Sequence, residues 1–526
     1  MVSTKLSFGA LSILSLVSAI LPQIASAVVD FNVDVDVDVD DDVAPIPKSN
    51  LRGLATSDAK TYIVSFNDKD VSPEKRCAAI AKANGGTVGY IYADVLNGCS
   101  ITLPVSQFQA QSTITALNNR PEVKLVNEDQ MMYITQSEVE SAANDSLFTS
   151  QAVSVSASVT AKSWGLDRVD QCSLPLNNLA TKQSATGVRV FILDTGVQST
   201  HQEFTGMIST ANAWTAYTDP FTDEYGHGTH VAGTACGLNY GVASNCVICP
   251  VQVLSSTGSG FNSDVIAGIN FVVGKCKGAA FRCVINMSLG SGTNSQLNAA
   301  VNGAVSNGVV VVVAAGNDAK DACNYSPASA ADAITVGSTT DKDEKSPFSN
   351  IGNCVDVYAP GSDIISASSS SNTGSKTLSG TSMASPHVAG MAAAILSQNP
   401  SLTPKQVRDS IVNKALMKPS TSTIPTWYIA VDCSTSSLTS QPTLKPTTKS
   451  PTAKPTTKSP TGKPSTNKPT VTKSPTGKPT LTAKPTTVKP TTKSPTSPPI
   501  FTPTSGSSTA SPTSCDMTAV YNIPTN

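Results

Sequence analysis

Three polar residues stand where a hydroxyl group could be turned into a nucleophile. Asp194 follows the apolar run "VFIL", His227 lies between two glycines in "GHG", and Ser382 follows "SGT" at the start of another apolar run. A serine hydroxyl is a weak nucleophile until a base removes its proton. An imidazole is such a base, and a buried carboxylate holds that imidazole in the required tautomer. The residue types for nucleophilic catalysis are therefore present, each close to a glycine.

A second chemistry is open at the same segment. The chain has four histidines, and His227 and His230 stand three positions apart, as two ligands of one metal ion could. A zinc hydrolase needs a third ligand and usually a glutamate as base. Glu224 precedes the pair, but the spacing "HExxH" does not occur. A metal-dependent hydrolase is therefore an alternative that the positions of the two rings can decide.

The residues between 164 and 433 alternate strand patterns with helix patterns. Nearly continuous apolar runs, typical of strands buried on both faces of a parallel sheet, cover 188–196, 245–254, 282–290 and 308–317. Helical spacing covers 263–276, 295–307 and 403–416, the last with Thr403 as N-cap and Pro404 after it. We predict a doubly wound, mostly parallel α/β sheet, with functional residues at the carboxyl ends of its strands.

The chain begins like a secreted protein. Residues 1–27 combine Lys5, an apolar stretch and small residues up to Ala27, which is typical of a signal peptide. No later run is long enough to cross a bilayer, so we expect a secreted, extracellular protein without a membrane span. Secretion favours disulfides for the twelve cysteines. The formal net charge of −1 argues against a nucleic-acid partner.

A small module precedes the α/β region. Residues 28–60 form an acidic leader in which valine and aspartate alternate, without a loop suited to a calcium ion. Residues 61–134 carry strand and helix patterns in a βαββαβ-like order, which predicts a compact α+β domain. Residues 135–163 are polar and rich in serine, and we interpret them as a linker.

The last segment, 434–526, has a different composition. It repeats threonine, proline and lysine, with eleven lysines and no acidic residue before Cys515. Such a composition cannot bury apolar surface, so we expect a disordered stalk, or a tail that binds extracellular matrix or cell wall. A competing hypothesis from this segment is a wall or matrix protein whose α/β domain is inert.

Four motifs together resemble the subtilisin superfamily of serine proteases (peptidase S8) and, within it, the proteinase K group. They are "LDTG" at 193–196, "HGTHVAG" at 227–233, "AAGN" at 314–317 and "GTSMASPHVAG" at 380–390. The resemblance implies a secreted serine endopeptidase that works through an acyl-enzyme. It makes Asp194 the orienting carboxylate, His227 the general base, Ser382 the nucleophile and Asn317 the oxyanion-hole donor.

The resemblance also implies how peptide and protein substrates bind. Two sets of residues resemble the walls of the primary specificity pocket, and a third resembles the strand that pairs with an extended substrate. They are Ser288, Leu289 and Gly290, then Ala315 and Gly316, and finally Gly258, Ser259 and Gly260. Backbone pairing accepts any extended peptide and leaves selectivity to the pockets. These motifs contain no acidic residue, so we expect broad specificity with an apolar or aromatic residue before the cut.

The module at 61–134 resembles the inhibitory propeptide of the same family. The resemblance implies a self-processing zymogen in which this propeptide is an intramolecular inhibitor. The mature chain would then begin after Ile134 and before Trp164, and this stretch offers no unique cleavage site.

One metal ion and several disulfides are further expectations. Asp356 matches the side-chain ligand of the family's main calcium site, with the carbonyls of Ala331 and Ala333 as its partners; we expect structural calcium and no organic cofactor. Cys323 and Cys354 match a pair found in bacterial relatives. Nearness in sequence suggests Cys276 with Cys283, and Cys77 can pair with Cys99. The partners of the remaining cysteines between 172 and 433 stay open: Cys172, Cys236, Cys246, Cys249 and Cys433.

Overall fold

The computed structural model describes residues 59–67, 71–104, 109–134, 159–218, 221–418 and 427–431. These residues belong to one compact unit within Met1–Pro442. The predicted signal peptide, nearly all of the acidic leader, most of the linker and the tail lie outside the described residues. No helix within the described ranges combines the length and hydrophobicity needed to cross a bilayer.

The N-terminal module, defined here as residues 60–134, has the predicted βαββαβ order. Its antiparallel sheet has the strand order β2-β3-β1-β4, and helices α1 and α2 each connect an inner strand to an outer one. The bounds are β1 Lys60–Phe66, α1 Pro73–Ala83, β2 Thr87–Tyr92, β3 Gly98–Leu103, α2 Ala110–Asn118 and β4 Val123–Glu128. Buried apolar side chains from both helices and from β1, β3 and β4 form one small core, and the partly buried Val88 and Ile91 of β2 pack against it.

The α/β domain is built around a large sheet. Among the described residues, nine strands join it in the order β10-β12-β9-β14-β16-β18-β19-β23-β22. All neighbours in it are parallel except the last pair, β23 and β22. The bounds are β9 Val188–Asp194, β10 Trp214–Thr215, β12 Val247–Gln252, β14 Arg282–Met287, β16 Val310–Ala314, β18 Ile334–Thr339, β19 Val357–Pro360, β22 Leu416–Lys418 and β23 Trp427–Ile429.

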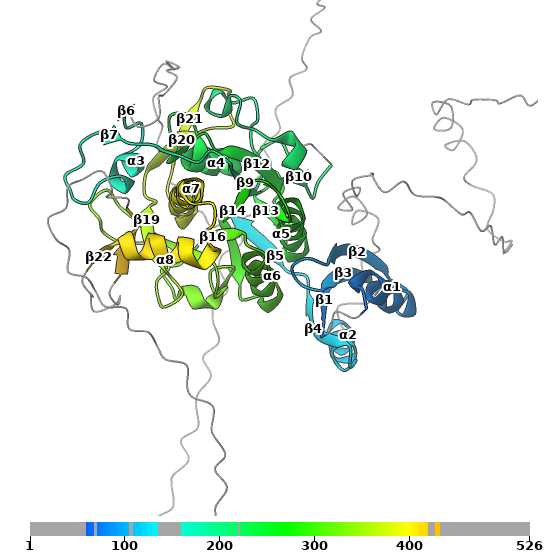
Figure 1. The fold of residues 1–526 in the computed structure, drawn as a ribbon. Helices are drawn as coiled ribbons and strands as arrows, with labels where there is room; N and C mark the ends of the chain where they lie inside the picture. Colours follow the sequence, from blue (N-terminus) through cyan, green and yellow to red (C-terminus); the bar gives the residue numbers. More distant parts are fainter. Residues whose placement is uncertain are drawn as a thin grey trace, which may run out of the picture. The chain divides into compact units, whose positions relative to one another are not determined.

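Helices cover both faces of this sheet (Figure 1). In β9, Val190 and Ile192 belong to one core, whereas Phe191 and Leu193 belong to the other. Successive strand residues point to opposite faces, so a strand covered on both sides must be apolar at nearly every position. The helices are α3 Trp164–Val169, α4 His227–Cys236, α7 Thr381–Gln398 and α8 Pro404–Lys414 around the first core, and α5 Asn262–Cys276 and α6 Ser295–Ser306 around the second.

The strand order reverses at β9. The chain runs from β9 outward to β12, then returns to β14 on the other side and continues through β16, β18 and β19. At such a switch point the loops leave the carboxyl edge in opposite directions and open a crevice. Asp194 is the last residue of β9, at this edge.

A short strand that the sequence did not predict joins the N-terminal module to the α/β domain. β5 (Met131–Ile134) lies between β13 (Ser259–Phe261) and β15 (Leu289–Gly292), antiparallel to both. β15 also pairs with β17 (Tyr325–Ser326). The module thus supplies the second strand of a four-stranded sheet whose other strands belong to the α/β domain.

The remaining elements are short. The end of the predicted linker, β6 (Val159–Thr160), pairs with β7 (Leu179–Ala180), so residues 159–160 belong to the α/β domain. The others are β8 Gln183–Ser184, η2 Gln202–Phe204, η3 Thr210–Asn212, β11 Ala243–Ser244, η4 Ala322–Asn324, β20 Ile364–Ala367 and β21 Ser375–Leu378.

Four disulfides join described cysteines. Three are the expected pairs Cys77–Cys99, Cys276–Cys283 and Cys323–Cys354. The fourth, Cys236–Cys246, was not predicted. Cys172 is also disulfide-bonded, whereas Cys249 is a free buried thiol whose pKa burial raises to about 12. Cys249 is therefore an inert core residue.

Candidate active site

The carboxylate and the imidazole predicted from the sequence are in contact. Oδ1 of Asp194 lies 2.7 Å from Nδ1 of His227, and both side chains are fully buried. Nε2 of His227 has no hydrogen-bond partner among the described residues. A carboxylate at Nδ1 favours the tautomer that carries its proton there, so Nε2 is left as the acceptor.

The glycines beside His227 allow this close approach. Gly226 has a φ of +96°, a conformation that side chains with a Cβ rarely adopt. A Cβ on Gly228 would meet the carbonyl oxygen of Gly196 at 2.1 Å and Cβ of Asp194 at 3.1 Å. The first turn of α4 can therefore lie against the end of β9 because Gly228 has no side chain.

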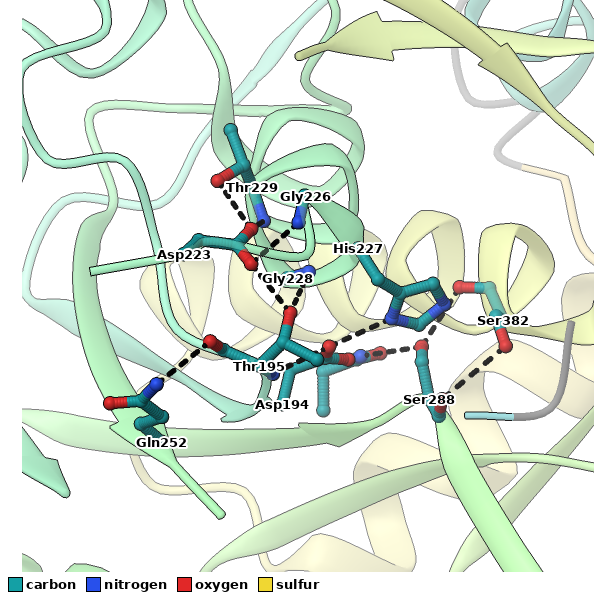
Figure 2. A network of polar contacts seen from close by, with 11 residues as sticks. Asp194, Thr195, Asp223, Gly226, His227, Gly228, Thr229, Gln252, Ser288 and Ser382 are labelled. Atoms are coloured by element: carbon teal, nitrogen blue, oxygen red, sulfur yellow. Dashed lines mark hydrogen bonds and ion pairs between the residues drawn. The ribbon is translucent and has the colours of Figure 1, made fainter. Parts of the chain in front are cut away.

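The predicted nucleophile lies beside this pair. Ser382 is the second residue of α7 and is fully buried, and Figure 2 shows it next to the ring of His227. Its Oγ donates to the carbonyl oxygen of Ser288 at 3.3 Å. Its own carbonyl oxygen accepts from Oγ of Ser288 at 2.8 Å. Pro386, four residues on, has no N–H to offer this carbonyl, so the helix leaves it available to Ser288.

A buried network behind His227 was missed by the sequence analysis (Figure 2). Asp223 accepts four hydrogen bonds, from the Thr195 hydroxyl at 2.7 Å, the Gly226 N–H at 2.7 Å, the Thr229 N–H at 2.7 Å and the Thr229 hydroxyl at 2.6 Å. Burial raises the pKa of Asp223, and these hydrogen bonds act in the opposite direction. The network ties the first turn of α4 to the residue after Asp194. An acid four positions before the histidine is the only sequence signal for it.

His230 does not form a metal site with His227. Its Nε2 lies 3.0 Å from the carbonyl oxygen of Ile364 and 3.1 Å from that of Lys376, so it donates to the backbone. Burial lowers the pKa of His230 to about 3. Within the described ranges, no group of three or more histidine, cysteine or acidic side chains could hold a metal ion. The geometry therefore does not support the metal-dependent alternative.

The other two histidines are structural. Nε2 of His201 contacts the carbonyl oxygen of Gly374 at 2.9 Å, and Nδ1 of His387 contacts that of Met383 at 2.8 Å. Both are buried, and burial lowers the pKa of each, to about 4 for His387. Among the described residues, neither ring forms a hydrogen bond with Asp194 or His227.

Asn317 follows β16 and is fixed by the start of α7. Its Oδ1 accepts from the N–H and from the hydroxyl of Thr381, both at 2.9 Å. With Oδ1 held in this way, the amide NH₂ is the group that can donate to a bound ligand. Thr381 directly precedes Ser382, so the first turn of α7 positions both the amide of Asn317 and the hydroxyl of Ser382.

The predicted substrate-binding strands are paired with β5. Ser259 and Gly260 lie opposite Tyr133 and Met132, while Leu289 and Gly290 lie opposite Ile134 and Tyr133. The N–H of Ile134 also donates to the carbonyl oxygen of Gly258 at 3.1 Å. An extended segment thus occupies the groove between the two strands, by β-strand addition on both sides.

A pocket opens beside the end of β5. Its volume is about 790 Å³ when the solvent at its open side is included, and Gly290, Ala315 and Gly316 line it together with Asn317. Small residues leave room for a large side chain. The exposed Asp318 also contributes to the lining, although no acidic residue occurs in the motifs from which the pocket was predicted.

The predicted calcium ligands do not fit a calcium ion in this structure. Oδ1 of Asp356 accepts from Nε of Arg408 at 3.0 Å and also from its Nη2. Nη1 of Arg408 donates to the carbonyl oxygen of Ala331 at 2.9 Å. Two of the three expected donors are therefore engaged by a guanidinium, and Ala333 alone does not make a calcium site.

The fold and the site together define a class of protein. A serine, an imidazole and a carboxylate at the carboxyl edge of a doubly wound sheet form the arrangement of a serine hydrolase with the subtilisin-like α/β fold. The sequence matches the subtilase family, Peptidase_S8, over residues 185–441. The chain belongs to the subtilase family of serine proteases.

Two relatives matched by sequence agree with this assignment. "Alkaline serine exoprotease A" of Vibrio alginolyticus is 50% identical over 264 residues, which cover 50% of this chain and 48% of that protein. "Extracellular serine proteinase" of Thermus sp. (strain Rt41A) is 42% identical over 329 residues, 62% of this chain and 73% of that protein. The crystal structure of "a cold adapted subtilisin-like serine proteinase" is 44% identical, covers 52% of this chain and 99% of that one, and has a TM-score of 0.49. The match thus spans about half the length of the Vibrio relative.

Proposed function

We propose that this protein is a secreted serine endopeptidase that cleaves peptide bonds through an acyl-enzyme. The contact between Asp194 and His227, with Ser382 beside the ring, carries the proposal. His227 takes the proton of the Ser382 hydroxyl at Nε2 as this oxygen attacks the scissile carbonyl, and then gives the proton to the leaving amine. Asp194 holds the ring and stabilises the imidazolium. A water molecule then attacks the acyl-enzyme: His227 takes the proton of this water and gives it to Oγ of Ser382, as the bond between Oγ and the acyl group breaks and the acid is released.

The negative oxygen of the tetrahedral intermediate needs donors that are already in position. In the proposal, these are the amide of Asn317 and the backbone N–H of Ser382. The contacts of Thr381 with Oδ1 of Asn317 support this role, because they orient the amide before substrate arrives. Donors that are fixed in advance stabilise developing charge without having to reorganise during the reaction.

Substrate would bind as β5 does. Backbone pairing with Gly258, Ser259 and Gly260 on one side, and with Ser288, Leu289 and Gly290 on the other, is independent of sequence. The small residues Ala315 and Gly316 leave space for an apolar or aromatic side chain before the cut. Asp318, an exposed residue of the pocket lining, would allow a basic side chain as a minor alternative. Cleavage of a peptide library only after lysine or arginine would contradict this specificity.

The chain would be made as a zymogen with the N-terminal module as its inhibitor. β5 fills the substrate groove, and further contacts hold the module in place. Asp129 accepts from the N–H of Ser263 at 3.0 Å, and Gln296 donates to the carbonyl oxygens of Ile63 and Leu125 at 2.9 and 3.1 Å. A segment that already pairs with both substrate strands excludes other peptides until it is released.

The strand register gives an expected cleavage site. Ile134, the last residue of β5, lies opposite Leu289, and Leu289 directly follows Ser288 in the chain. Ser288 is the residue whose carbonyl oxygen contacts Oγ of Ser382. We therefore expect cleavage of the bond between Thr135 and Gln136, which lie outside the described residues.

Two measurements test the proposal. Ser382→Ala should accumulate as uncleaved precursor, and wild-type protein should carry Gln136 as its N-terminus by sequencing. Casein hydrolysis by wild type should be lost on treatment with a serine-reactive sulfonyl fluoride, but not with a zinc chelator. Full maturation of Ser382→Ala would mean that another protease makes the cut. Absence of hydrolysis after verified maturation would favour a wall or matrix protein with an inert domain.

A further inference from the structure

We propose that Arg408 supplies the positive charge at Asp356 that a calcium ion would otherwise supply, so that this part of the fold does not depend on calcium. The inference concerns stability and is independent of the proposed protease activity. It starts from the contacts of one guanidinium with a carboxylate and a backbone carbonyl that were expected to bind the metal.

The guanidinium of Arg408 donates hydrogen bonds to two acceptors, the carboxylate of Asp356 and the carbonyl oxygen of Ala331. Nε and Nη2 both reach Oδ1 of Asp356, and Nη1 reaches the carbonyl oxygen of Ala331 at 2.9 Å. A planar guanidinium with five N–H donors can satisfy several oxygens at once, as an ammonium cannot. The other carboxylate oxygen of Asp356, Oδ2, accepts from the N–H of Thr335 at 2.9 Å. Both oxygens of Asp356 are thus engaged by the protein.

The surroundings make a positive charge necessary. The side chain of Asp356 is only 13% exposed, and a carboxylate removed from water requires a compensating partner. Arg408 is 32% exposed, so its own charge is less strongly desolvated. A calcium ion needs six to eight oxygen ligands. It would have to displace Arg408 and would then be repelled by the nearby guanidinium.

The contact also has a structural consequence. Asp356 immediately precedes β19, Ala331 lies three residues before β18, and Arg408 belongs to α8. One side chain therefore fastens the last described helix to the sequence around two neighbouring strands of the sheet. A metal ion bound only by Asp356 and the carbonyls of Ala331 and Ala333 would not involve α8.

The test uses thermal unfolding of the full chain in the Ser382→Ala background, which removes self-digestion. Melting temperatures are measured with calcium chloride and with a calcium chelator. Arg408→Ala should lower the melting temperature in chelator by about 5 °C, because it leaves a mostly buried carboxylate unpaired. The matched control is Lys405→Ala, which removes a 78% exposed lysine paired with Asp409 on the same helix. This control should shift the melting temperature by no more than about 1 °C.

The response to calcium shows whether Arg408 replaces a calcium ion or only forms an ion pair with Asp356. Any rise that calcium gives the background chain should persist in Asp356→Asn, because it then comes from another site. Arg408→Ala should gain a new calcium-dependent rise, and Asp356→Asn added to Arg408→Ala should abolish it. If Arg408→Ala folds only when calcium is supplied, the result supports the proposal equally. If Arg408→Ala does not fold with calcium or with chelator, the experiment uses Arg408→Lys instead. This variant should lower the melting temperature by less than about 5 °C, and calcium should not change its melting temperature.

Three results would overturn the proposal. The first is a calcium-dependent rise in the background chain that disappears in Asp356→Asn, which would mean that calcium binds there beside Arg408. The second is an Arg408→Ala variant as stable in chelator as Lys405→Ala. The third is an Arg408→Ala variant that loses stability but gains no response to calcium, which would leave an ion pair at a place where calcium never binds.

Discussion

The hydroxyl of Thr195 donates to the carboxylate of Asp223 at 2.7 Å, and the same hydroxyl accepts from the N–H of Gly228 at 3.0 Å. Thr195 follows Asp194 directly, and Gly228 follows His227. The hydrogen bond between Asp194 and His227 is therefore accompanied by a second one, between the residues that follow them in the chain, Thr195 and Gly228. This second hydrogen bond helps to hold the carboxylate and the imidazole at their observed distance.

Asp223→Asn should reduce kcat by roughly 10²-fold with little change in KM, because small displacements of catalytic groups have effects of that size. The amide offers only one acceptor oxygen where four donors converge, so α4 must shift. The matched control is Glu224→Gln, an exposed acid one residue along, which should keep wild-type kcat. Both variants are matured by added wild-type enzyme that is then removed by an affinity tag, and they are assayed on a chromogenic peptide. Equal kcat values in the two variants would contradict the positioning role.

Asn317→Ala should lower kcat by about 10²–10³-fold and leave KM nearly unchanged. The scale is the one found for the corresponding asparagine of subtilisin, a member of the same family. The loss of kcat follows because the donor acts on the negative oxygen of the intermediate and not on the bound substrate. Asp318→Asn, one residue further, should keep kcat on a substrate with an aromatic residue before the cut. A rise in KM without a fall in kcat would instead assign Asn317 to substrate binding.

Met132→Ala should weaken the hold of the N-terminal module. Met132 is fully buried in the core beside the substrate strands, whereas its neighbour Tyr133 is 52% exposed. Truncation of a buried methionine costs about 2–3 kcal/mol, which corresponds to roughly 30- to 150-fold weaker binding. After cleavage, activity should therefore appear much sooner on dilution of the complex. Tyr133→Ala is the control and should change this lag by less than about threefold; identical lags would argue against β5 as the main inhibitory contact.

His230 should contribute to loss of stability in acid. Burial lowers its pKa to about 3 in the folded protein, below the ordinary value of 6.5. Between about pH 3 and pH 6.5, His230 is therefore protonated in the unfolded chain but neutral in the folded chain. The stabilising contribution is present above pH 6.5 and is lost as the pH falls towards 3. His230→Gln should reduce the slope of the unfolding free energy against pH by about 1.4 kcal/mol per pH unit between roughly pH 4 and 6.

The measurement is denaturant unfolding at several pH values in the Ser382→Ala background. The slope is informative even if His230→Gln lowers stability at every pH, because a lost packing contact shifts the curve without tilting it. His387→Gln should tilt the curve in the same direction, over a window that ends near its pKa of about 4. An unchanged slope in both variants would contradict the assignment.

The sequence was sufficient to predict positions where a residue type suited to catalysis lies at the end of a strand or helix with a clear hydrophobic pattern. Asp194 ends an apolar strand, and His227 and Ser382 begin helices, so the fold rule for parallel sheets places all three at one edge. The buried strands were predictable for the same reason, since only a sheet covered on both faces needs residues such as Val310 to Ala314 to be apolar throughout.

Other features depend on partners far away in the chain. β5 has only four residues, "MMYI", and is a strand because β13 and β15 pair with it from more than a hundred residues further on. Asp223 lies in a loop, where periodicity gives no information. Arg408 has the spacing of an ordinary surface arginine on α8, and only the fold brings it to Asp356.

The position of β5 between two strands also limits which proteins this site could attack. A chain segment can enter only if it is extended and if its backbone N–H and C=O groups are free on both edges at once. In helices and in the inner strands of folded proteins, the backbone N–H and C=O groups already form hydrogen bonds within the protein. Selection at such a slot would depend on the local unfolding of the target more than on its amino-acid sequence, so damaged or loosely folded proteins would be consumed before intact ones.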